Sequence, residues 1–157
     1  MTQPLHSHVE DALHLVEKGE FVGPLLARVV VGAAFVGTGW GKLHSLDKLT
    51  EFFVSLHIPA PHFQAGLVAS VEFSGGLALI FGLLTRLAAI PLAVTMVVAI
   101  ITAKLPNAEG FFDVVGFEEL TYLVVFTWLV FAGPGRASLD HLLYKRFVKT
   151  EPAARTM

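Results

Sequence analysis

This chain contains the apolar run FQAGLVASVEFSGGLALIFGLL at residues 63–84 and the apolar run LAAIPLAVTMVVAIITA at residues 87–103, with only Thr85 and Arg86 between them. The first run carries a single charge, Glu72, and the second carries none. About 17–25 apolar residues cross the hydrocarbon core of a bilayer as a helix, which satisfies its own backbone hydrogen bonds. The two runs therefore predict two membrane-spanning helices that form a tight antiparallel hairpin.

Two further apolar runs extend this pattern. Residues 21–41 are interrupted only by Arg28, and residues 117–133 begin beside Glu118 and Glu119. The composition agrees, because 54 % of the residues are hydrophobic and only 15 % are charged, against about 25 % charged residues in soluble domains. A domain of this size cannot hide so much apolar surface from water. The sequence predicts an all-α integral membrane four-helix bundle.

The spans divide the chain into three parts: an N-terminal segment (1–20), the transmembrane domain (21–136) and a C-terminal tail (137–157). Apolar residues at helical spacing predict amphipathic interfacial helices in both flanking parts and at residues 42–62, between the first two spans. Lys and Arg are more frequent on the side that holds both termini and Arg86. The positive-inside rule then places both termini in the cytoplasm, with the chain in a bacterial-type inner membrane.

Two charges inside the spans, Arg28 and Glu72, are the first candidates for a site. A charge near the bilayer centre costs ~2.5–3.5 kcal/mol, so it usually faces the bundle and has a partner. If Phe21 and Leu84 lie at the same face, the depths of the two charges differ by about 8 Å. This is near the reach of an extended arginine side chain, and helix tilt could close the difference. The pair is then a structural ion pair or one wall of a polar ligand site. In a third alternative, Arg28 extends to lipid head groups and Glu72 is protonated.

The residues near Glu72 and the charges at the opposite end of the bundle each allow a structural or a ligand-binding role. Gly75 and Gly76 either let two helices approach closely or make room for a ligand beside Glu72. At the opposite end of the bundle, Lys42, Lys104 and Glu118 form a second possible polar site. A carboxylate at the start of the fourth span is otherwise favoured by the helix dipole alone.

Several chemistries are absent from the sequence. The chain has no cysteine, which removes thiolate nucleophiles and iron–sulfur ligation. The seven histidines form no i, i+4 pair with a carboxylate on a span, so we expect no metal site. The net charge of −2 gives no attraction toward nucleic acid. No catalytic residue is identified.

A series of short motifs resembles the DoxX family of small four-helix membrane proteins. The motifs are Ala27-Arg28 with Gly32, Gly39-Trp40-Gly41-Lys42-Leu43, Val71-Glu72-Phe73-Ser74-Gly75-Gly76, Gly82-Leu83-Leu84-Thr85-Arg86-Leu87-Ala88-Ala89, Gly110-Phe111-Phe112, Gly116-Phe117-Glu118, Gly133-Pro134-Gly135-Arg136 and Ser138-Leu139-Asp140. The resemblance covers about residues 20–143 and implies a four-helix bundle in the cytoplasmic membrane. The family is associated with thiosulfate:quinone oxidation and with membrane-bound sulfur or oxidative-stress complexes. This chain has Lys104 where the family often has a histidine, which weakens any role that needs an imidazole there.

Three functions remain open after the sequence is read. The first is a membrane subunit of a quinone-linked redox complex, with a polar pocket near Arg28 and Glu72 and with quinone as the implied cofactor. The second is a non-enzymatic anchor or assembly factor for a cytoplasmic partner. The third, a small-solute or lipid transporter, ranks last because no internal repeat suggests alternating access. The expected partners are the lipid bilayer and a redox protein, and a homo-oligomer is also compatible with the sequence.

Overall fold

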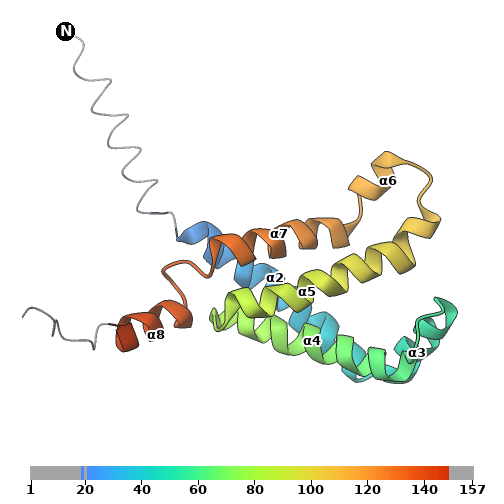
Figure 1. Cartoon of the computed structure of the whole chain (residues 1–157), viewed down its shortest axis with the longest axis horizontal. Coiled ribbons are helices and arrows are strands. Elements are labelled where there is room, and N and C mark those ends of the chain that lie inside the picture. Colours follow the sequence, from blue (N-terminus) through green and yellow to red (C-terminus); the bar gives the residue numbers. More distant parts are fainter. Residues whose placement is uncertain (1–18, 20, 149–157) are drawn as a thin grey trace, which may run out of the picture.

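A computed structural model describes residues 19 and 21–148 of the chain, and this part contains helices and no strand. Three helical stretches are long and apolar enough to cross a membrane: α2 (Val22–Leu43), α4 (Pro61–Phe81) and the stretch Thr85–Asn107. The last of these is α5 (Thr85–Ala99) with its continuations η1 (Ile100–Lys104) and η2 (Leu105–Asn107). The chain is therefore an all-α membrane protein (Figure 1).

The remaining helices are shorter. They are α3 (Leu46–Ser55), α6 (Phe111–Val115), α7 (Glu118–Ala132) and α8 (Leu139–Val148). Helix α7 has 15 residues, slightly fewer than the ~17–25 that usually span a bilayer, so a fourth span at 117–133 stays a prediction. Helices α3 and α8 confirm the helical segments expected between the first two spans and in the tail. The helix expected in the N-terminal segment, at residues 5–17, lies outside the described residues.

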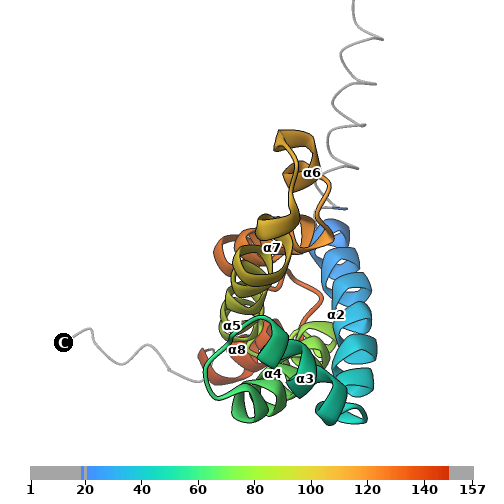
Figure 2. The same ribbon diagram turned by 90° about the vertical axis from the view of Figure 1, so that its right-hand side faces the viewer.

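Helices α2, α4, α5 and α7 surround one apolar core, as the end-on view shows (Figure 2). Phe35 of α2 packs edge-on against Tyr122 and Phe126 of α7, with ring centroids 5.1 and 5.0 Å apart. Helices α3 and α6 lie at one end of the bundle and α8 lies at the other (Figure 1). The two ends therefore offer separate places for a site.

Glycines bring α2 and α4 into close contact. A Cβ atom on Gly32 would lie 2.8 Å from the carbonyl oxygen of Gly76, and one on Gly39 would collide with the backbone of Phe73. Side chains at these positions would force the two helices apart, as in other close transmembrane contacts. These contacts fix which residues of α2 and α4 lie at the same depth.

The turn between α4 and α5 begins earlier than the sequence suggests. Gly82 (φ +64°) ends α4 in the left-handed conformation that glycine adopts without strain. Thr85 is completely buried and already starts α5, so Thr85 and Arg86 are not the linker. Asp140 explains the early start, because its carboxylate accepts hydrogen bonds from the backbone N–H groups of Leu84 (2.7 Å) and Thr85 (3.0 Å). A carboxylate at the N-terminus of a helix is favoured by free N–H groups and by the helix dipole.

Candidate functional site

Arg28 and Glu72 are both buried, but they do not bind each other. Arg28 is completely buried, and its Nη2 donates to the carbonyl oxygen of Ala137 at 2.5 Å. Its Nε donates to the carbonyl oxygen of Pro24 at 3.3 Å. Glu72, only 2 % exposed, binds Lys42 instead. The direct Arg28–Glu72 ion pair, one of the three alternatives that the sequence left open, is therefore not formed.

The relative depth of α2 and α4 explains why this pair does not form. The glycine contacts place Gly76 beside Val36 and place Gly82 beside the guanidinium of Arg28. At 1.5 Å per residue, Gly82 lies about 15 Å beyond Glu72 along α4. The estimate of about 8 Å assumed that Phe21 and Leu84 lie at one level, and the close glycine contacts shift the helices away from that alignment.

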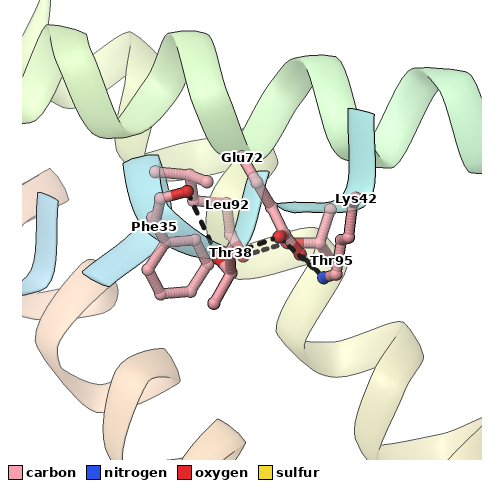
Figure 3. A network of polar contacts seen from close by, with 6 residues as sticks. All are labelled: Phe35, Thr38, Lys42, Glu72, Leu92 and Thr95. Carbon is pink, nitrogen blue, oxygen red and sulfur yellow. Dashed lines mark hydrogen bonds and ion pairs between the residues drawn. The ribbon is translucent and has the colours of Figure 1, made fainter. Parts of the chain in front are cut away.

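Glu72 belongs to a polar cluster with Thr38 and Lys42 (Figure 3). Lys42 Nζ lies 2.5 Å from Glu72 Oε1 and 2.6 Å from Oε2, and Thr38 Oγ1 lies 3.2 Å from Oε2. Thr95 of α5 points toward the same cluster. Lys42 stands near the end of α2 and keeps 34 % of its side chain exposed. The lysine thus reaches inward from the end of the bundle to neutralise a buried carboxylate.

The other charges at this end pair differently from the prediction. Lys104 Nζ lies 3.2 Å from Glu119 Oε1. Glu118 is exposed at the first turn of α7. Because Lys42 binds Glu72 and Lys104 binds Glu119, the structure does not assemble Lys42, Lys104 and Glu118 into one polar site.

Gly75 and Gly76 serve helix packing. A Cβ atom on Gly75 would lie 3.0 Å from the side chain of Leu92, and one on Gly76 would lie 2.8 Å from the backbone of Gly32. Leu92 of α5 and the backbone of α2 therefore lie directly against these two glycines. Of the two alternatives for Gly75 and Gly76, the contacts therefore favour close helix packing.

A cleft of about 780 Å³ lies at the opposite end of the bundle, between the start of α2, the α4–α5 turn, the end of α7 and α8. We call it the α8 cleft. Its mainly apolar residues are Phe21, Pro24, Leu84, Leu87, Trp128 and Ala132, and its polar residues include Arg86, Arg136, Asp140, His141 and Tyr144. Arg28 lies directly behind it, through its bond to Pro24. The Arg28 half of the predicted site is therefore next to a cleft, whereas the Glu72 half is not.

The segment after α7 folds back to build the cleft. Besides the bond from Arg28 to Ala137, the backbone N–H of Asp140 donates to the carbonyl oxygen of Gly82 at 3.0 Å. Ser138 Oγ accepts from the N–H of His141 at 3.1 Å, which caps α8. These bonds tie α8 to both α2 and the α4–α5 turn.

Gly133 holds Arg86 in the wall of the cleft. Arg86 Nη2 donates to the carbonyl oxygen of Phe131 at 3.3 Å, at the C-terminal end of α7 where a cation is favoured. A Cβ atom on Gly133 would lie 3.1 Å from Arg86 Nε and Nη2, and its φ of +80° is itself strained for other residues. The absence of a side chain at Gly133 therefore leaves the space that the Arg86 guanidinium occupies.

Sequence reasoning missed this cleft. Its residues come from α2, α5, α7 and α8 and from the segments beside them. The hydrophobic periodicity of the sequence does not indicate how the segment after α7 folds back. A signal was present in the motifs Gly133–Arg136 and Ser138–Asp140, which follow the last apolar run and combine turn residues with a helix-capping serine and an aspartate. Among the described residues, no group of three His, Asp or Glu side chains is placed to hold a metal ion.

The fold and its ion pairs define a helical membrane protein with buried charges. Its sequence matches the DoxX family model over residues 23–105, and the chain belongs to the DoxX family of membrane proteins. Inner membrane protein YqjF of Escherichia coli K12 is 35 % identical over 135 residues, which cover 84 % of this chain and 100 % of YqjF. "Putative oxidoreductase CatD" of Bacillus subtilis is 33 % identical over 126 residues, covering 79 % of this chain and 89 % of CatD. The membrane protein Rv3486 of Mycobacterium tuberculosis is 39 % identical over 130 residues, covering 76 % of this chain and 80 % of Rv3486. No solved structure matches the chain.

Proposed function

We propose that this chain is the membrane subunit of a redox-linked system and that the α8 cleft holds the head group of a lipid-soluble quinone. The cleft itself carries the proposal, because it combines an aromatic and aliphatic lining with guanidinium donors at one end of a transmembrane bundle. Ligand sites of this kind are mostly apolar, with a few polar groups that fix orientation. The name of the relative CatD, which refers to an oxidoreductase, agrees with it.

The residues of the cleft suit a quinone head group. Arg86 and Arg136 can donate hydrogen bonds to its carbonyl oxygens, and Phe21, Trp128 and Tyr144 can pack against its ring. The volume of about 780 Å³ exceeds the smallest ligand sites of ~300 Å³. Bound there, a quinone would supply two-electron redox chemistry that the side chains of this chain lack.

The position of the cleft suggests where a partner would act. The positive-inside rule places the end that carries Arg86 and the tail in the cytoplasm. In our proposal a cytoplasmic redox protein docks at this end and exchanges electrons at the cleft. The chain then contributes ligand binding and membrane placement, and the partner contributes the electron donor or acceptor.

Titration of the purified protein with a short-tailed quinone analogue tests the proposal. We expect saturable quenching of Trp128 fluorescence in a Trp40→Phe background, because Trp128 lines the cleft. Ala132→Phe adds a ring to the lining and should weaken binding roughly tenfold, a typical loss of about 1.4 kcal/mol. Val124→Phe on the same helix is the matched control, because Val124 is 61 % exposed away from the cleft.

Two outcomes of this titration would contradict the proposal. If no quinone analogue quenches saturably, or if Ala132→Phe and Val124→Phe bind alike, the α8 cleft is not a quinone site. The chain would then be better explained as an anchor for a cytoplasmic partner, because α8 would still be tied to the bundle by Arg28 and Asp140.

A further inference from the structure

The α8 cleft contains more positive than negative charge. Arg86 and Arg136 both line it, and Asp140 is the carboxylate among its lining residues. Asp140 is already engaged, because its two oxygens accept from the backbone N–H groups of Leu84 and Thr85. Arg86 donates a hydrogen bond to the backbone carbonyl of Phe131, a neutral group that leaves its charge uncompensated. The lining therefore has two guanidinium groups and one carboxylate, so its positive charge is in excess.

A further positive charge lies just behind the lining. Arg28 is completely buried, and its Nη1 has no hydrogen-bond partner among the described residues. Its Nη2 donates to the carbonyl oxygen of Ala137, three residues before Asp140 in the folded-back segment. Arg28 therefore adds positive charge close to the cleft, and Arg86 and Arg136 are the guanidinium groups that line it.

We infer that the α8 cleft selects an amphiphile whose head group carries a negatively charged oxygen. The inference rests on the proposal that this cleft binds an amphiphile, and it adds the chemical class of the head group. A guanidinium presents paired N–H donors that match an oxyanion, and charge-assisted hydrogen bonds are about twice as strong as neutral ones. The aromatic and aliphatic lining residues would contact the apolar part of the same molecule.

Two sources supply this chemistry, the phosphate of an anionic phospholipid and an ionised hydroxyl on a quinone ring. The experiment therefore uses matched pairs of ligands in neutral detergent. One pair is a 2-hydroxy-3-alkyl-1,4-naphthoquinone, which is ionised at neutral pH, and its neutral 2-methoxy analogue. The other pair is short-chain phosphatidic acid and the diacylglycerol with the same chains. Inorganic phosphate alone tests for a site that takes a free anion.

We expect the anionic member of at least one pair to bind roughly tenfold or more tightly than its neutral partner, and the pair that shows this identifies the source. In Arg136→Gln the preference should fall severalfold, and in Arg86→Gln combined with Arg136→Gln it should disappear. Arg136→Gln alone keeps the bond between Arg86 and Phe131, so it reports on charge even if the double variant is unstable. Lys48→Gln is the control, because it removes an exposed positive charge from α3, at the other end of the bundle.

Three results would overturn the inference. Equal affinity for anionic and neutral ligands, with saturable binding retained, would remove the charge selectivity and leave the proposed quinone site intact. Binding of inorganic phosphate as tightly as the anionic amphiphiles would identify a simple anion site. Failure of every ligand to bind would overturn both the inference and the proposed function.

Discussion

Lys42→Ala is expected to lower the free energy of unfolding by roughly 3 kcal/mol. The substitution leaves the carboxylate of Glu72, which is 2 % exposed, without its cation. Breaking a buried ion pair from one side costs about 3–5 kcal/mol, and the lower end applies because Lys42 keeps 34 % of its side chain exposed. Chemical unfolding in detergent micelles measures the change.

A double-mutant cycle tells the Lys42–Glu72 pair from the Arg28–Glu72 pair that the sequence suggests. Lys42→Ala combined with Glu72→Gln should be less destabilising than the sum of the single changes, because either change removes the same interaction. Arg28→Ala combined with Glu72→Gln should be additive within about 0.5 kcal/mol, since the two sites are far apart. Additivity in the first cycle and coupling in the second would contradict the structure.

Gly39→Ala should destabilise the bundle by about 3 kcal/mol or more, at the upper end of the usual effect of overpacking. The added methyl group would meet the backbone of Phe73, which cannot rotate away as a flexible side chain can. Helices α2 and α4 must then separate, which also stretches the bond between Lys42 and Glu72. Thermal unfolding in detergent, with helicity as the signal, measures the loss.

Gly37→Ala is the matched control on the same helix. A Cβ atom at Gly37 meets no atom within 4 Å, and alanine favours the helical conformation by about 1 kcal/mol relative to glycine. This variant should therefore be as stable as the native protein or more stable. If Gly39→Ala and Gly37→Ala behave alike, α2 and α4 do not approach through Gly39, and the depth alignment of the charged residues loses its basis.

The spans could be predicted from the sequence because an apolar segment prefers lipid to water whatever its tertiary contacts are. Residues 63–84 and 87–103 are apolar whatever their neighbours are, so their transmembrane assignment needs no tertiary information. The partner of Glu72 could not be predicted in this way, because it depends on the depth of α2 relative to α4. That depth is set by contacts such as Gly39 against Phe73, and a shift of one or two helical turns exchanges Arg28 for Lys42.

The α8 cleft could not be predicted either, because it is built by contacts between residues that are far apart in the sequence. Helix α8 could be predicted from its own residues, but its position depends on Arg28 reaching Ala137 and on Asp140 capping α5. Both contacts join residues far apart in the chain. Arg28, a buried arginine in the first span, needs a hydrogen-bond acceptor, and Glu72 is the carboxylate that the sequence suggests for this role. The structure uses a backbone carbonyl of the tail instead.

Photo-crosslinking in native membranes shows directly whether the α8 cleft binds an amphiphile. A quinone analogue with a photoreactive ring substituent is activated, and the labelled peptides are identified by mass spectrometry. We expect labels within residues 84–87, 128–136 and 140–144, with the signal reduced in Ala132→Phe. Labels confined to the surroundings of Glu72, or spread evenly over the lipid-facing helices, would contradict it.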